Sequence, residues 1–175
     1  MAGVKPSYEA EVRRRAHRIL QAFDPQSRGT HVGDVPRQEL AGMIDHTVLK
    51  PEATPAMIDT ACAEALEHRF ASVCVNPCYV ERCAERLADS GIMVCSVVGF
   101  PLGATLTVAK VYEAKRAVSL GAGEIDMVLW IGGLKAGDCA AVRDDIRAVS
   151  DACHEQGAIC KVIIEAGPVS YTHLR

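Results

Sequence analysis

Short apolar runs alternate with helix-like segments along most of the chain, from residue 43 onward. Each run is rich in Val and Ile and ends at Gly, Pro or a polar residue, as is typical of buried parallel strands. The five predicted strands are residues 43–50, 71–77, 92–101, 124–133 and 160–167. Strand–helix alternation of this kind predicts a parallel α/β sheet with right-handed crossovers.

Four helices are predicted between the strands from their start signals, apolar stripes and stops. The start signals are Thr54-Pro55, Asn76-Pro77, Thr105 or Thr107, and Asp138. Three helices have an apolar stripe: Ile58, Ala61, Cys62, Ala65 and Leu66 in the first; Val108, Val111 and Val118 in the third; Val142, Ile146 and Val149 in the fourth. The stops are Gly91, Gly121 and Gly157. A short helix is expected from Pro36 to Gly42, and an amphipathic helix from Tyr8 to Phe23.

The first strand is not followed by the glycine-rich turn of a doubly wound nucleotide-binding fold, so a TIM (β/α)8 barrel is favoured. Because a full barrel needs eight such units, five strands predict a barrel truncated after about the fifth strand. We divide the chain into residues 1–36, an N-terminal helical extension and loop; 37–167, the first five β/α units; and 168–175, a tail that matches no barrel pattern.

Composition narrows the class of protein without naming a function. The 175 residues are 49% hydrophobic and 23% charged, with a net charge of -3, as in an ordinary globular domain. This balance gives no reason to expect a nucleic-acid or membrane partner, and no apolar run approaches the length of a membrane span. Most of the eight cysteines lie in apolar patterns without a CxxC pair, so we expect small buried thiols, no metal and a cytoplasmic location. The cysteines expected to be buried are Cys62, Cys74, Cys83, Cys95, Cys139, Cys153 and Cys160.

A lone acid, Asp126, stands inside the apolar run 124–133. Strand alternation places Asp126 on the face opposite Ile125 and Met127, and burial of an unpartnered carboxylate is costly. The same parity directs polar groups from other strands into one barrel interior. The side chains expected to face inward are Asp45, Thr47, Ser72, Cys74, Asn76, Asp126, Lys161, Ile163 and Glu165.

Several of these residues also have structural interpretations. Asp126 could cap a neighbouring backbone, and Lys161 either neutralises Asp126 or Glu165 in an ion pair or has a direct chemical role. Asn76 is expected to cap the second helix. His46 has helix-facing parity, which favours a core histidine, and Lys50 and Lys135 are interpreted as solvated loop charges.

A carboxylate beside lysines in a partly dry pocket suits proton transfer next to a carbonyl group. A lysine with a depressed pKa could also form a Schiff base. The residue types alone leave both possibilities open.

Five motifs together resemble the deoxyribose-phosphate aldolases, class I enzymes that interconvert 2-deoxy-D-ribose 5-phosphate with acetaldehyde and D-glyceraldehyde 3-phosphate. They are IDHTVLKPEAT (44–54), SVCVNPCYV (72–80), VVGFPLGATLTVAKVYEAKRAV (97–118), GAGEIDMVLWIGGLKAGD (121–138) and CKVIIEAG (160–167). The resemblance implies a (β/α)8 barrel, Asp126 as the acid of a proton relay, and Asp45 and Lys161 as supporting groups in the substrate pocket. It also implies no metal or organic cofactor, small phosphorylated sugar and aldehyde substrates, a cytoplasmic enzyme and a possible homodimer.

The sequence departs from this family where the covalent chemistry is expected. The family's Schiff-base lysine lies in a Lys-Thr-Ser-Thr-Gly motif on the sixth strand, and neither that motif nor the phosphate-binding loops are present. We therefore expect the chain as given to be an incomplete and inactive part of such an aldolase. The alternatives are another Schiff-base phosphosugar aldolase of the same barrel class, and a non-catalytic half-barrel that acts as an oligomerisation module.

Overall fold

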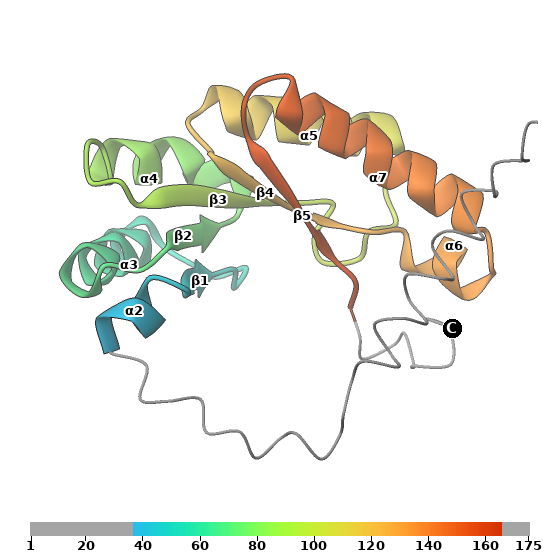
Figure 1. The fold of residues 1–175 in the computed structure, drawn as a ribbon. Coiled ribbons are helices and arrows are strands. Elements are labelled where there is room, and N and C mark those ends of the chain that lie inside the picture. The colour runs from blue at the N-terminus through green and yellow to red at the C-terminus, as the bar shows by residue number, and fades with distance from the viewer. Residues whose placement is uncertain (1–36, 166–175) are drawn as a thin grey trace, which may run out of the picture. The chain divides into compact units, whose positions relative to one another are not determined.

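The computed structural model describes residues 37–165, which form a five-stranded parallel sheet with helices between the strands (Figure 1). The strands follow the sheet in chain order: β1 (Asp45–Val48), β2 (Ser72–Val75), β3 (Met93–Val98), β4 (Glu124–Val128) and β5 (Ile159–Ile163). The first four lie inside the predicted runs, and β5 begins one residue before the predicted run 160–167. Their order is that of consecutive units of a (β/α)8 barrel. The expected helix at 8–23 and the tail at 168–175 lie outside the described residues.

The helices pack on the outer face of the sheet, apart from the two five-residue helices α2 and α6, which lie near strand ends (Figure 1). They are α2 (Arg37–Ala41), α3 (Pro55–His68), α4 (Val80–Arg86) after the 3-10 turn η2 (Pro77–Tyr79), α5 (Thr107–Ser119), α6 (Ile131–Lys135) and α7 (Cys139–His154). Two predicted caps are confirmed: Thr54 Oγ1 accepts from Met57 N at 3.4 Å, and Asp138 Oδ1 accepts from Ala141 N at 3.1 Å. No helix in the described part of the chain is long and apolar enough to cross a membrane.

Strand alternation separates two sets of side chains. The outer set, with Val73, Val75, Ile125 and Met127, forms the main core against the helices. The inner set is smaller and more polar; its apolar part is Cys74, Cys95 and Val97, with Leu49 and Ile163 packed against them. The predicted inward parity of the strands is therefore confirmed.

The sheet is strongly curved, as one contact between its two edge strands demonstrates. Lys161 on β5 reaches Asp45 on β1, with Nζ and Oδ2 2.6 Å apart. In a flat sheet, four strand spacings would separate these strands by about 19 Å, which exceeds the combined reach of the two side chains. Curvature therefore brings the inner face into one concave surface.

Several local predictions were wrong. Leu66 is 44% exposed, because it lies about 80° around α3 from Ile58, at the margin of the apolar stripe. Val108 is 71% exposed, because α5 instead buries the face that carries Lys110 and Ala114. Cys139 is exposed at the first turn of α7.

The boundaries of two elements also differ from the prediction. Asn76 precedes η2 but makes no capping bond; its Nδ2 donates instead to the carbonyl oxygen of Leu49 at 3.3 Å. The fourth strand ends at Val128, and residues 131–133, which were predicted as strand, begin α6. This contact fits the expected inward-facing position of Asn76 better than it fits a helix cap.

Candidate active site

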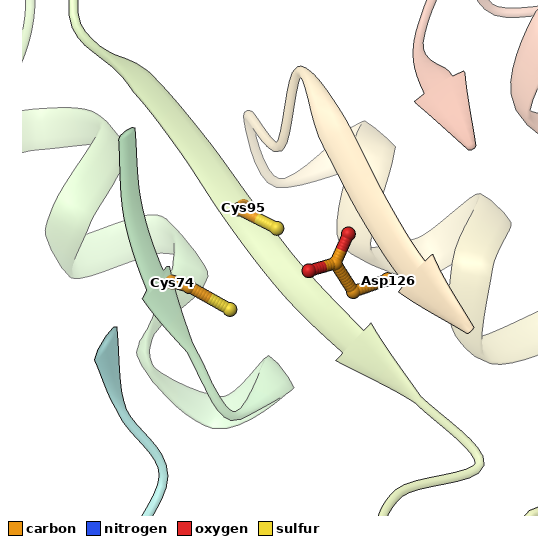
Figure 2. A group of neighbouring side chains, drawn as sticks. All are labelled: Cys74, Cys95 and Asp126. Atoms are coloured by element: carbon orange, nitrogen blue, oxygen red, sulfur yellow. The ribbon is translucent and has the colours of Figure 1, made fainter. Parts of the chain in front are cut away.

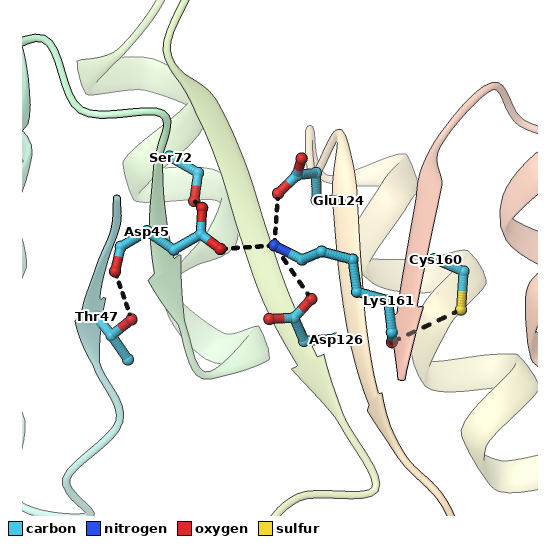
Figure 3. A network of polar contacts seen from close by, with 7 residues as sticks. All are labelled: Asp45, Thr47, Ser72, Glu124, Asp126, Cys160 and Lys161. Carbon is cyan, nitrogen blue, oxygen red and sulfur yellow. Dashed lines mark hydrogen bonds and ion pairs between the residues drawn. The ribbon is translucent and has the colours of Figure 1, made fainter. Parts of the chain in front are cut away.

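The inner face brings together polar side chains from all five strands. Cys74 on β2, Cys95 on β3 and Asp126 on β4 point into the same space (Figure 2). Asp45 on β1 and Lys161 on β5 approach it from the two edges of the sheet (Figure 3). The three site residues expected from the sequence, Asp45, Asp126 and Lys161, thus lie next to one another.

Lys161 is the centre of this cluster. Its ammonium group lies 2.6 Å from Asp45 Oδ2, 3.0 Å from Glu124 Oε2 and 3.5 Å from Asp126 Oδ1 (Figure 3). The ion pair with Asp126 foreseen from the sequence is present but is the longest of the three. Among residues 37–165, Lys161 pairs with these acids and not with Glu165.

The charges in the cluster shift two pKa values. Burial by itself would lower the pKa of Lys161, but hydrogen bonds to Asp45 and Glu124 outweigh burial and raise the pKa above its ordinary range. Burial would raise the pKa of Asp45, whereas hydrogen bonds from Lys161 and from Ser72 Oγ, at 2.7 Å, lower it. Lys161 is therefore a persistent cation and Asp45 a persistent anion near neutral pH.

Asp126 differs from the other acids of the cluster. Its side chain is 17% exposed, and its Oδ1 is buried and accepts no hydrogen bond from the described residues. A carboxylate oxygen that merely capped a strand end would be occupied by a backbone amide. The capping interpretation is thus not supported, and the atom is available to a further partner.

The remaining candidates lie outside the cluster. Lys50 and Lys135 are exposed. His46 has the predicted helix-facing parity but is 30% exposed rather than a core residue, and its Nε2 lies 2.6 Å from Glu64 Oε2. Glu124 was not chosen from the sequence, although it shares the parity of Asp126 and begins the same strand.

The arrangement suits proton transfer better than nucleophilic attack by Lys161. A lysine acts as a nucleophile only as the neutral amine, and three nearby carboxyl groups oppose that form. A cation beside a partly buried carboxyl group can instead help a proton to move to and from a bound substrate. The geometry therefore supports an acid–base cluster.

The sequence and the fold match a known group of proteins. Residues 40–170 match the family model described as DeoC/LacD family aldolase. The deoxyribose-phosphate aldolase of Bdellovibrio bacteriovorus is 57% identical over 127 residues, which cover 73% of this chain and 57% of that relative. The chain therefore spans a little over half the length of this curated relative.

Two solved structures share the fold. A protein of Coccidioides immitis, provisionally described as a deoxyribose-phosphate aldolase, superposes with a TM-score of 0.77 at 35% identity, over 92% of this chain and 64% of that one. The tetrameric deoxyribose phosphate aldolase of Aeropyrum pernix superposes with a TM-score of 0.70 at 31% identity, over 77% and 56%. The fold is accordingly that of an aldolase barrel, with five of its strands present in the described residues. From the family match and these likenesses together, the chain belongs to the DeoC/LacD family of aldolases.

Proposed function

We propose that this chain supplies the acid–base part of an aldolase that interconverts 2-deoxy-D-ribose 5-phosphate with acetaldehyde and D-glyceraldehyde 3-phosphate. The substrate assignment rests on the relatives, which are named as deoxyribose-phosphate aldolases. The observation that carries the role of this segment is the buried Asp126 oxygen, free of hydrogen bonds from the described residues and 3.5 Å from a lysine ammonium group.

The reaction requires a group that both accepts and returns a proton. Cleavage breaks the bond between C2 and C3 of the sugar, takes the proton from the 3-hydroxyl group and delivers one to C2. A carboxyl group with an oxygen that accepts no hydrogen bond from the described residues can perform both transfers, and the Lys161 ammonium group lies 3.5 Å from that oxygen. In this proposal Asp126 is the catalytic acid–base, while Asp45 and Lys161 orient it and shape the substrate pocket.

The geometry of Asp45 supports its supporting role. Its carboxylate is occupied on both sides, by Ser72 Oγ on Oδ1 and by Lys161 Nζ on Oδ2. It fixes the lysine in place and has little capacity for proton exchange with a substrate. As further parts of the proposal, the enzyme acts in the cytoplasm, as a homodimer, on small phosphorylated sugar and aldehyde substrates.

A chimera tests the role of Asp126. The matching 127 residues of the Bdellovibrio aldolase would be replaced by those of this chain, and cleavage of 2-deoxyribose 5-phosphate would be measured. We expect an active chimera, and we expect Asp126→Asn to lower kcat by roughly 10²-fold or more, the usual scale for a general acid–base group.

Asp144→Asn is the matched control, because Asp144 is an exposed carboxylate on α7 whose ion-pair partner among residues 37–165 is its neighbour Arg143. The control should keep the activity of the chimera. Near-normal turnover of a folded Asp126→Asn chimera would contradict the assignment, and preferential cleavage of another phosphosugar would favour the related aldolase class.

A further inference from the structure

Two buried thiols lie beside Asp126 on the inner face. Cys74 and Cys95 are opposite each other in the register of β2 and β3, and both are buried, at 3% and 0% exposure. Their sulfur atoms and a carboxylate oxygen of Asp126 all lie within 4.8 Å of one another (Figure 2). Three adjacent strands thus present two sulfurs and one oxygen to one point.

This set of atoms suits a soft divalent cation. Zn²⁺ binds Cys sulfur at about 2.3 Å and carboxylate oxygen at about 2.0–2.2 Å, and thiolates select such metals over Mg²⁺ or Ca²⁺. Tetrahedral geometry at these lengths needs ligand atoms roughly 3.5–3.8 Å apart, so the three side chains would have to close by at most about 1 Å. Side-chain rotation suffices for a shift of that size.

The charge of the inner face favours a cation. The carboxyl groups of Asp45, Glu124 and Asp126 face the single ammonium group of Lys161. The two shorter contacts of the lysine, at 2.6 and 3.0 Å, are with Asp45 and Glu124, and its contact with Asp126 is the longest, at 3.5 Å. A second sign of an incomplete site is Asp126 Oδ1, which is buried, accepts no hydrogen bond from the described residues and has the Lys161 ammonium group 3.5 Å away.

We propose that Cys74, Cys95 and Asp126 form a binding site for a soft divalent cation such as Zn²⁺ or Cd²⁺. Binding replaces the two thiol protons, which leave as H⁺, so one dication enters and two positive charges depart. The net charge of the interior stays the same, and water completes the fourth position on the concave side.

The binding itself does not depend on the proposed function. If Asp126 is the acid–base of an aldolase, a bound cation occupies the carboxylate that the reaction needs, and the cation is an inhibitor. Failure of metal binding would leave the chimera experiment on Asp126 unaffected, so the two proposals can fail separately.

Two other thiol pairs in the described residues provide internal comparisons. Cys62 and Cys83 adjoin each other between α3 and α4, and Cys153 and Cys160 between α7 and β5. Neither pair forms part of a three-ligand group among residues 37–165, whereas Cys74 and Cys95 do so with Asp126. A buried thiol pair alone should therefore bind the cation much more weakly.

The test uses the 175-residue chain with its exposed thiols removed by Cys78→Ser and Cys139→Ser, kept reduced and titrated with Cd²⁺. We expect one ion per chain, thiolate-to-cadmium charge-transfer absorption, and release of two protons per ion. In this background Cys95→Ser should weaken binding by roughly tenfold or more and reduce the absorption. Asp126→Asn, which keeps the side-chain shape, should weaken binding by a similar factor while the absorption per bound ion persists.

Cys62→Ser and Cys153→Ser are the matched controls and should leave affinity and stoichiometry unchanged. Circular dichroism would verify that each variant is folded, and Cys95→Ala would replace any Cys95→Ser protein that is not. Equal affinity after loss of Cys95 or of the Asp126 carboxylate, or strong binding abolished by Cys62→Ser, would overturn the site.

Discussion

Two lysine–carboxylate clusters of this protein lie on opposite faces of the same sheet, and they differ in what they leave unfilled. On the outer face, Lys110 is fully buried between α5, α7 and β4; its Nζ lies 2.7 Å from Asp145 Oδ2 and 3.0 Å from the carbonyl oxygen of Val128. Thr107 Oγ1 donates to the other oxygen of Asp145 at 2.7 Å. Every partner is occupied.

The inner cluster, by contrast, is partly exposed and contains a polar atom without a hydrogen bond from residues 37–165. Lys161 is 37% exposed, faces three carboxyl groups, and leaves Asp126 Oδ1 without a hydrogen bond from the described residues. Buried polar groups are normally satisfied, so an unfilled one marks a place where a ligand or a proton is expected. The outer cluster is thus fully satisfied within the fold, whereas the inner one retains an unfilled position, as the proposed acid–base role requires.

The largest expected effect is on the outer pair. Lys110→Met should lower the free energy of unfolding by about 3–5 kcal/mol, because Asp145 would remain buried without its counter-charge. Lys110→Met combined with Asp145→Leu should recover most of that loss, since an apolar pair can replace a buried ion pair. Urea unfolding curves measure both. A small loss in the single variant would show that the pair is not structurally important.

Lys161→Leu should have a smaller effect on stability. Exposed ion pairs contribute about 0–1 kcal/mol to stability, and breaking a buried ion pair costs about 3–5 kcal/mol. Because Lys161 is only partly exposed, its loss should lower the free energy of unfolding by about 1–2 kcal/mol. In the chimera the same change should impair turnover more than folding. If Lys161→Leu lowered the free energy of unfolding as much as Lys110→Met while activity per folded molecule was retained, Lys161 would be a structural residue and not part of the site.

The sequence predicted the inner cluster and missed the outer one for a physical reason. Strand parity has a period of two, so Asp45, Asp126 and Lys161 could be assigned to one face from their positions alone. Helix α5 offered no such guide, because a lysine on a helix is normally expected in solvent. Val108 was therefore placed inward, although the face with Lys110 and Ala114 is the buried one.

Other features could not be predicted because they depend on tertiary distance. The stem of Lys110 packs against Gly99, where a Cβ would lie 3.1 Å from Lys110 Cε and the lysine would have to shift by a few tenths of an ångström. Likewise, strand parity places Glu124 and Cys95 on the inner face, but the order and register of the paired strands determine that they adjoin Lys161 and Cys74.

A third prediction concerns how the contribution of Lys161 to stability depends on pH. The folded-state pKa of Asp45 lies below its ordinary 3.8, so the contribution is present above that pH and is lost as pH falls through the lower folded value. The pKa of Lys161 lies above its ordinary 10.5, so the contribution is present below pH 10.5 and is lost as pH rises through the higher folded value. The stability difference between wild type and Lys161→Leu should therefore be greatest between these limits.

Unfolding curves recorded from acid to alkaline pH would measure this difference. Asp144→Asn again serves as the control, because its effect should stay near zero throughout. A difference that grows as the solution becomes acidic would show that Lys161 is not paired with Asp45 in solution.

The smallest expected effect is on the modification of Lys161 by acetaldehyde and borohydride, which should leave this lysine without a covalent adduct. Treatment of the chain with acetaldehyde and borohydride traps neutral amines as alkylated lysines, but the carboxyl groups around Lys161 raise its pKa and hold it as the ammonium ion. Peptide mass spectrometry should find Lys161 less modified than the exposed Lys50 and Lys135. Glu124→Gln, which removes one of the hydrogen-bonded acids, should increase modification of Lys161 and of no other lysine. A stoichiometric adduct on Lys161 in the unaltered chain, accompanied by turnover, would instead make Lys161 the nucleophile, because only a neutral amine could form it.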